Sequence, residues 1–217
     1  MVVIQQLLTG PVAPLGSHGI PSGIDKRSVA GRVWLGREGL AGDAQGDRRH
    51  HGGPEKAVHH YAFDHYAFWR GIIGELEVLA RPGAFGENLS TVGLIEAEVA
   101  VGDTFRLGTA LIQVSQGRQP CWKLNLRFGV LDMALRVQRS GRIGWYYRVL
   151  EEGFVEAGDA LVLVDRISPE WTVERLWRVR FVHPPGAGGN PAQGGVGPLP
   201  GTRRRAPPPR PPPPPGR

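Results

Sequence analysis

The single cysteine of the chain, Cys121, is the first residue that could do chemistry. It lies in the polar segment Ser115-Gln-Gly-Arg-Gln-Pro-Cys-Trp-Lys, directly after a predicted strand and close to Arg118 and Lys123. Nearby cations lower the pKa of a thiol and increase its thiolate fraction, which a nucleophile or a soft-metal ligand requires. A buried, inert cysteine is the alternative, and the sequence leaves both open.

A histidine-rich segment is the second candidate site. It surrounds the glycine pair at residues 52–53 and carries several potential metal ligands: Asp43, Asp47, His50, His51, His59, His60 and His65. Zinc binding is one interpretation, but the adjacent His59 and His60 occupy a predicted strand and would point to opposite faces. We therefore expect hydrogen-bonding turn residues rather than zinc ligands. The backbone N–H groups of residues 50–53 could still bind an anion or a cofactor.

Two shorter segments also carry polar groups that could contact a ligand. Lys26 and Arg27 could grip a phosphate, although adjacent charges are also typical of a solvated surface. In Phe85-Gly-Glu-Asn-Leu-Ser, a carboxylate and the Asn88 amide follow a glycine. This segment could bind a heteroaromatic or phosphate ligand, or it could form a well-bonded turn.

Short apolar segments bounded by glycine predict the strands that must position these residues. They cover residues 2–8, 31–35, 99–101, 110–115, 143–149 and 160–164. Helical periodicity is confined to residues 63–76 and 130–137 within this part of the chain. Many short strands with only two helices among them predict a mainly β fold with a closed or nearly closed β-barrel.

The C-terminal part has a different character. Ser168 and Pro169 suit the start of a helix, with an apolar stripe formed by Val173, Leu176 and Trp177. From residue 181 the chain is rich in Pro, Gly and Arg, which cannot bury enough apolar surface to order. The prediction is a barrel domain at 1–167, the start of a helical segment at 168–180 and a disordered tail at 181–217.

Charge and composition exclude several classes of protein. Residues 1–180 contain 21 basic and 20 acidic residues, so the excess charge belongs to the tail and the body is not a nucleic-acid-binding surface. One cysteine excludes an intramolecular disulfide and a protein-held iron–sulfur cluster. The start is unlike a signal peptide, and no apolar run approaches the roughly 20 residues needed to cross a bilayer. We expect a cytoplasmic protein without a membrane partner.

The order of the motifs resembles the MOSC-domain family (molybdenum cofactor sulfurase C-terminal domain). The similarity runs from about residue 2 to 179 and is greatest to the stand-alone bacterial YiiM-type branch, which is linked to resistance against 6-hydroxylaminopurine. The blocks that carry it are Lys26-Arg27, Gly39-Leu-Ala-Gly-Asp, His51-Gly-Gly-Pro-Glu-Lys-Ala-Val, Phe85-Gly-Glu-Asn-Leu, Gln113-Val-Ser-Gln-Gly-Arg-Gln-Pro-Cys-Trp-Lys-Leu and Gly144-Trp-Tyr-Tyr-Arg-Val.

The resemblance implies a β-barrel and a site for the molybdenum cofactor (molybdopterin). Cys121 falls where the family's cysteine gives a thiolate to molybdenum or carries a sulfane sulfur. The other residues implied as cofactor ligands are Lys26, Arg27, His51, Lys56, Asn88 and Arg118. The family pattern leads us to expect proline at position 117. The glycine found there would loosen the cysteine loop.

The implied reaction is the two-electron reduction of an N-hydroxylated base or related small compound to the amine. The chain has too few cysteines for a cluster and no dinucleotide-binding fingerprint, so a separate reductase must supply the electrons. A sulfur or cofactor carrier, with a persulfide or thiolate at Cys121, is the alternative from another functional class. A zinc hydrolase that uses the histidines is a third.

The C-terminus departs from the YiiM-type pattern, which continues into a helical bundle. The abrupt change to Pro, Gly, Arg and Ala suggests that the residues after about 179 come from a frameshift. On this hypothesis the Val173, Leu176 and Trp177 stripe lacks its partners and forms an exposed, aggregation-prone patch.

Overall fold

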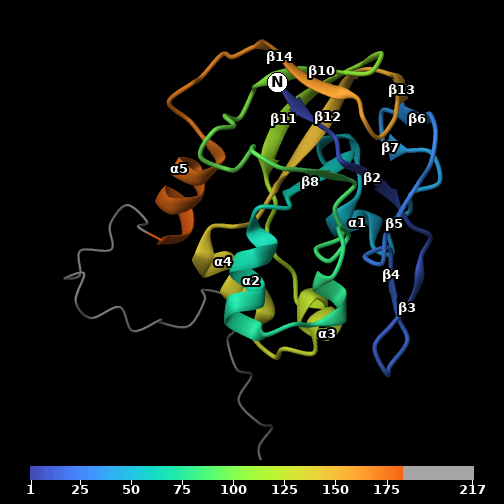
Figure 1. The fold of residues 1–217 in the computed structure, drawn as a ribbon, viewed down its shortest axis with the longest axis vertical. Coiled ribbons are helices and arrows are strands. Elements are labelled where there is room, and N and C mark those ends of the chain that lie inside the picture. The colour runs from blue at the N-terminus through green and yellow to red at the C-terminus, as the bar shows by residue number, and fades with distance from the viewer. Residues whose placement is uncertain (183–217) are drawn as a thin grey trace, which may run out of the picture. The chain divides into compact units, whose positions relative to one another are not determined.

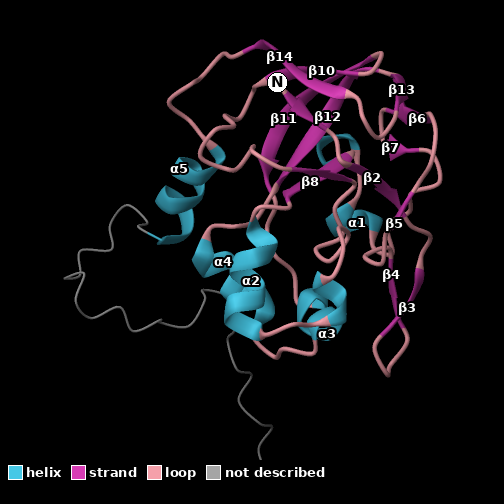
Figure 2. Ribbon diagram, viewed as in Figure 1, coloured by secondary structure: helices cyan, strands magenta, loops and turns pink. Residues whose placement is uncertain are grey.

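A computed structural model describes residues 1–182, without the side chains of Arg48, His50 and Val182. The predicted disorder and frameshift origin of residues 183–217 therefore concern a segment outside the described residues. Apart from the hairpin at residues 13–22, the strands gather at one end of the described part and the helices α2, α3 and α4 at the other (Figures 1 and 2). The fold is mainly β with a few helices, as predicted.

Nine strands form the main sheet, in the order β1-β14-β10-β11-β12-β8-β9-β2-β5. Neighbours are antiparallel except β8 and β9, which are parallel. Their bounds are β1 Val2–Val3, β2 Gln6–Thr9, β5 Arg27–Ser28, β8 Val58–Ala62, β9 Leu89–Thr91, β10 Thr104–Leu107, β11 Ala110–Gly117, β12 Trp145–Glu151 and β14 Ala160–Asp165. A three-stranded sheet and a hairpin complete the β structure: β6 Val33–Gly36, β7 Gly39–Leu40 and β13 Gly153–Val155, then β3 Ala13–Leu15 and β4 Ile20–Ser22.

The N-terminal segment joins the two sides of the main sheet. Its first half, β1, pairs with β14, and its second half, β2, pairs with β9. Between them, the Ile4 N–H donates to Asp159 O at 2.9 Å and the Gln5 N–H donates to Ser90 O at 3.0 Å. The predicted strand at 2–8 is therefore two strands. Because the ladder is interrupted here, the sheet curls round without closing as a complete barrel.

Alternation along the strands builds the core. Buried and half-buried side chains alternate along β11, with Ile112 and Val114 inside, and along β12, with Trp145 and Tyr147 inside. This period of two is the pattern of a sheet with one face on the core. Aromatic rings also fill the core beside β8, where the ring of Tyr61 stacks on that of Phe85 with centroids 4.0 Å apart.

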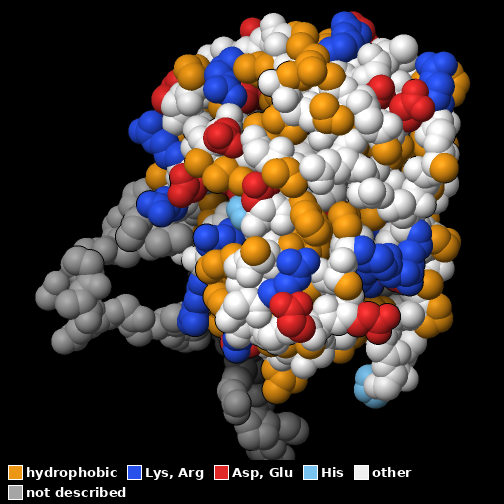
Figure 3. Space-filling model, viewed as in Figure 1, with side chains coloured by type: hydrophobic (Ala, Val, Ile, Leu, Met, Phe, Trp, Pro, Cys, Tyr) orange, Lys and Arg blue, Asp and Glu red, His pale blue; other side chains and the backbone are white. Residues whose placement is uncertain are grey.

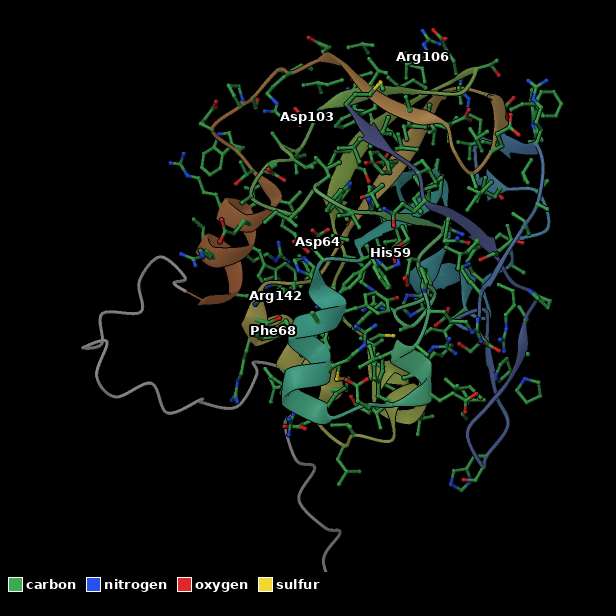
Figure 4. The ribbon with its side chains drawn as sticks, viewed as in Figure 1. His59, Asp64, Phe68, Asp103, Arg106 and Arg142 are labelled. Carbon is green, nitrogen blue, oxygen red and sulfur yellow. The ribbon has the colours of Figure 1, made fainter. Side chains whose placement is uncertain are left out.

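Five α-helices lie within the described residues: α1 Arg48–His51, α2 His65–Ile73, α3 Lys123–Phe128, α4 Met133–Ser140 and α5 Val173–Trp177. The predicted helix at 63–76 ends early because Gly74 takes a φ of 83°, which interrupts the helical backbone. Helix α2 also contacts the end of the α4 segment, where the Arg142 guanidinium lies 3.6 Å from the centroid of the Phe68 ring (Figure 4). None of these helices combines the length and apolar character needed to cross a membrane.

Residues 99–101 are not the strand that we predicted. Only Ala100 forms a bridge, to Thr172, within a series of turns. The Asp103 carboxylate explains this geometry because it accepts the Ala100 N–H at 2.8 Å and so closes a turn at the Gly102-Asp103 pair. Apolar character alone indicated burial here, and Val99 is indeed buried.

The C-terminal helix begins later than predicted. Thr172, not Ser168, caps α5, because its side-chain oxygen accepts the Arg175 N–H at 3.1 Å. Ser168 instead closes a turn, in which its carbonyl accepts the Trp171 N–H at 3.0 Å. The helix continues as a π-helical turn over Arg178–Val182, so residues 181–182 of the predicted disordered tail are helical.

The prediction of an exposed stripe on this helix is also wrong for two of its three residues. Val173 and Trp177 are 1% and 5% exposed, and Leu176 is half-buried. They pack beside Gly117, where an added Cβ would lie 2.9 Å from Ile143 and 3.4 Å from Val173. Gly117 is the last residue of β11, and its lack of a side chain leaves room for α5.

We predict that Trp177→Ala lowers the free energy of unfolding by about 3–5 kcal/mol, because a buried aromatic ring is lost. Its indole N–H also donates to Gln138 O at 2.8 Å. Urea unfolding measures the change. Leu131→Ala, at a side chain that is 95% exposed, is the control and should change stability by less than about 0.5 kcal/mol. Equal midpoints for the two variants would contradict the packing of α5.

Candidate functional site

Cys121 lines a pocket between the start of α3, the start of β8 and the loops around them. The polar side chains that line it are Ser22, Asp43, Gln45, His51, Lys56, His59, Asn88, Arg118, Cys121, Lys123 and Tyr146. Five of the residues predicted from the sequence therefore meet here: His51, Lys56, Asn88, Arg118 and Cys121. Segments far apart in the chain supply them, because β8 lies beside β9 and β12 in the sheet.

Glycines let two backbone segments form one wall of this pocket. A Cβ on Gly23 would lie 1.8 Å from Ala44 O, and one on Gly46 would lie 2.5 Å from Pro21 O. Side chains at these positions would collide with backbone atoms that cannot move aside. The residue pair Gly42-Asp43 and the β4 segment are consequently held at a fixed separation, which sets the position of Asp43.

The Cys121 thiol has an unusual electrostatic environment. Burial raises its pKa, but a hydrogen bond with His51, the charge of Arg118 and a hydrogen bond from the Lys123 backbone lower it, and the result is a pKa of about 7. The side chain is only partly buried, so reagents can reach it. A large fraction of Cys121 is therefore thiolate at neutral pH, which favours the reactive one of the two interpretations. Of the two cations near it in the sequence, Arg118 acts through its charge and Lys123 only through its backbone.

Arg118 is a buried cation with an open hydrogen-bond donor. It is 5% exposed, and its backbone N–H donates to Gly144 O at 3.0 Å. Its guanidinium bonds the Tyr146 hydroxyl, yet Nε has no partner. Within residues 1–182 it forms no salt bridge with a carboxylate. A buried charge of this kind favours an anionic or hydrogen-bond-accepting ligand.

His59 places a second open polar atom at the pocket. Its side chain points into the interior from β8 (Figure 4) and Nε2 has no partner. Burial, followed by the charge of Arg118, holds the pKa of His59 well below its ordinary value, so the ring is neutral at pH 7. The ring also bonds the Gly86 backbone. A ligand with a polar edge would satisfy both Nε2 of His59 and Nε of Arg118.

Lys26 lies below the pocket and pairs with Asp43. The ammonium group forms a short salt bridge with Oδ1 of Asp43, and the two side chains are 6% and 1% exposed. Burial lowers the pKa of Lys26, and the Asp43 charge partly offsets this effect. Asp43 also accepts the Gly10 N–H at 3.0 Å and the Asn88 amide at 2.9 Å. Lys26 therefore supports the floor of the pocket.

Asn88 is occupied by the protein itself. Its amide donates to Leu8 O at 3.1 Å and to Asp43, and its carbonyl accepts the His59 N–H at 3.0 Å. The neighbouring Glu87 is fully buried and accepts the Gly83 and Phe85 N–H groups at 2.7 and 3.0 Å. The Gly-Glu-Asn block is thus the well-bonded turn that was one of our two interpretations.

Arg27 does not join the other predicted residues. Its guanidinium forms a 2.8 Å salt bridge with Asp25, and the two side chains are 61% and 43% exposed. It does not line the pocket. Adjacent residues of a strand point to opposite faces, so Lys26 and Arg27 cannot both enter the same site.

The family model of the MOSC domain matches residues 47–162. The chain belongs to the MOSC-domain family. It is 48% identical over 151 residues to Protein YiiM of Escherichia coli, covering 70% of this chain and 67% of that protein. The crystal structure of YiiM from Geobacillus stearothermophilus has a TM-score of 0.69 at 32% identity and covers 83% of this chain and 84% of that chain.

A third relative of this MOSC-domain protein differs in size. A protein of Gibberella moniliformis named Reductase is 40% identical over 161 residues. The match covers 74% of this chain and only 28% of the reductase. The region similar to the MOSC domain is therefore one part of a much longer chain.

The histidines of this MOSC domain have separate partners. His60 contacts Thr91 and Tyr147 at 2.8 and 3.1 Å, and His65 pairs with Glu96 at 2.7 Å. His59 and His60 point to opposite sides of β8, as predicted. Among the residues described, no three His, Cys, Asp or Glu side chains lie where they could share a metal ion.

The sequence patterns did not mark Tyr146 or Lys123 as site residues, and they gave Asp43 only as a potential metal ligand. Tyr146 alternates with the core residues Trp145 and Tyr147 along β12, so its type gave no sign of a pocket role. Lys123 was noticed only as a charge near Cys121, and its Nζ donates to Pro21 O at 2.9 Å. Asp43 follows Gly42 in a turn pair, which was the available signal.

We predict that alkylation of Cys121 by iodoacetamide rises with pH around a midpoint near 7. The thiolate is the reactive form and predominates above the pKa. His51→Ala removes a hydrogen bond that lowers this pKa, so the midpoint moves upward. A shift of one unit would reduce the thiolate fraction at pH 7 about fivefold. His18→Ala, at an exposed turn, is the control. An unmoved midpoint in His51→Ala would refute the contact.

We predict that Asp43→Ala destabilises the fold by about 3–5 kcal/mol, because it leaves the Lys26 ammonium buried without its partner. The double variant Lys26→Met/Asp43→Ala should recover part of this loss. Urea unfolding of the wild type, both single variants and the double variant gives the coupling energy. Simple addition of the two single effects would contradict the pairing.

Proposed function

We propose that this MOSC-domain protein binds the molybdenum cofactor in the Cys121 pocket and reduces N-hydroxylated bases or related compounds to amines. One observation carries the proposal: a thiol with a pKa of about 7 lies beside the buried Arg118, whose Nε has no partner. A soft thiolate suits a transition metal, and a buried guanidinium suits a phosphate or an oxygen-rich ring.

The residues of the pocket fit such a cofactor. Cys121 would hold the metal, and Arg118 with His59 would bind polar atoms of the pterin, which satisfies two buried groups that are otherwise unpaired. Lys56, which also lines the pocket, would face the phosphate. Lys26 and Asn88 have a positioning role in this proposal, because their polar atoms bind Asp43.

His51 controls the proton of Cys121 in this proposal. Binding of a metal requires the thiolate, so the thiol proton must leave. The hydrogen bond between His51 and Cys121 gives the imidazole direct access to that proton. His51 would pass it on to solvent when the ligand binds, so that binding releases a proton. Metal affinity should therefore rise with pH through the range in which Cys121 titrates.

The overall reaction consumes two electrons and two protons: R–NHOH + 2 e⁻ + 2 H⁺ gives R–NH₂ + H₂O. When bound, the cofactor supplies the two-electron redox chemistry that cleavage of the N–O bond requires. The chain contains one cysteine and cannot hold an iron–sulfur cluster, so a separate reductase would deliver the electrons. The relative named Reductase supports an oxidoreductase role.

Elemental analysis by mass spectrometry tests this function on protein purified from a cofactor-producing host. We predict near-stoichiometric molybdenum in the wild type and its loss in Cys121→Ala, because the thiolate ligand is absent. Leu131→Ala, far more exposed and outside the pocket, is the matched control. Metal-loaded protein should then convert 6-hydroxylaminopurine to adenine when a chemical reductant is added.

Three other results would count against the proposal. Zinc that persists in Cys121→Ala would refute the molybdenum site. No metal, together with one extra sulfur on Cys121, would favour a sulfur carrier, which a thiol with this pKa also suits. Molybdenum without turnover of any N-hydroxylated compound would favour a cofactor carrier over a reductase.

A further inference from the structure

Cys121 borders a second recess on its solvent side. Four residues line both this outer recess and the pocket described above: His51, Lys56, Cys121 and Tyr146. The pocket beyond them holds the buried Arg118 and His59. The outer recess instead contains the exposed side chains of Gln119 and Trp122. The reactive sulfur therefore lies between a pocket that contains buried polar side chains and a recess that contains exposed ones.

Trp122 differs from the other tryptophans of the chain, all of which the structure describes. The Trp34 ring contacts Phe154, Trp171 lies under the Arg175 guanidinium, and Trp69, Trp145 and Trp177 each contact another ring. Among the side chains that the structure describes, no ring or cation contacts Trp122 in this way, and the Trp122 side chain is 54% exposed. An indole face left open beside a reactive group suits a flat ligand.

Two glutamines extend this surface with hydrogen-bonding groups. Gln119 makes no side-chain hydrogen bond to the described residues, and Gln116 makes one long bond of 3.4 Å to Glu55 O. An amide offers both a donor and an acceptor, which matches the polar edge of a heteroaromatic base. The recess thus combines a stacking face, amide groups and the edge of Cys121.

We propose that this outer recess is the substrate site, in which the ring of a purine-like N-hydroxylated base stacks on Trp122. This inference rests on the proposed function and identifies the residue that selects planar heteroaromatic compounds over aliphatic hydroxylamines. Gln116 and Gln119 would bind the edge of the base. The substituent that reacts would face Cys121 and the inner pocket.

Equilibrium binding of 6-hydroxylaminopurine and of adenine to the full-length protein, prepared from a cofactor-producing host, tests this site by calorimetry. Loss of a base–aromatic stack should weaken binding about tenfold or more in Trp122→Ala. Trp122→Phe keeps a ring and should remain within about threefold of the wild type. Trp171→Ala replaces another exposed tryptophan and should bind both bases normally.

Kinetics separate this inference from the proposed function. Trp122→Ala should raise KM for 6-hydroxylaminopurine about tenfold and leave KM for N-methylhydroxylamine unchanged, because the latter has no ring to stack. Equal binding by Trp122→Ala and wild type, with the folded state intact by circular dichroism, would overturn the substrate site and leave the molybdenum proposal standing. Base binding that depends on Trp122, in protein from a cofactor-producing host that carries no molybdenum and does not turn the base over, would support the site and count against only the proposed chemistry.

Discussion

The buried carboxylate of Asp43 is the interaction on which the site depends. It binds the Lys26 ammonium, the Gly10 N–H and the Asn88 amide, and so joins the β2 end, the β5 segment and the turn after Phe85. A buried charge is stable only when its partners are complete, so these three segments and the Gly42-Asp43 turn must adopt one mutual geometry. The pocket wall and the approach to Cys121 follow from that geometry. None of these contacts takes part in the proposed reaction itself.

The charged groups at the pocket are of two kinds: an ion pair at its floor, and a buried cation in its wall that has no carboxylate partner among the described residues. Lys26 and Asp43 cancel each other, whereas Arg118 keeps its charge without a carboxylate. This difference decides which cation can act on a ligand, because a paired charge exerts little field outside its pair. On the surface, acidic and basic side chains are interspersed on the face shown in Figure 3, as the near-balance of charges in residues 1–180 leads one to expect.

Sequence patterns predicted those features that depend on residues close together in the chain. The strands around residues 110–115 and 143–149 followed from apolar segments, and the environment of Cys121 followed from its charged neighbours. The sequence did not predict that the side chain of Asn88 is fully hydrogen-bonded within the protein. Its partners Leu8 and Asp43 are far from it in the chain, so no local pattern indicates these bonds. Residues 99–101 misled for another reason: apolar residues can also be buried in a turn, which here the side chain of Asp103 holds.

The split pairing of residues 2–9 has a consequence for how the protein forms. The strands β1 and β2 need β14, at Ala160–Asp165, and β9 as their respective partners. Contacts between such distant parts of the chain carry a large loop-closure cost and slow folding. On the ribosome, β2 can pair once β9 has emerged, but β1 must wait for β14. Val2 lacks its partner Leu161 during this interval, so β14 is the strand whose arrival completes the sheet.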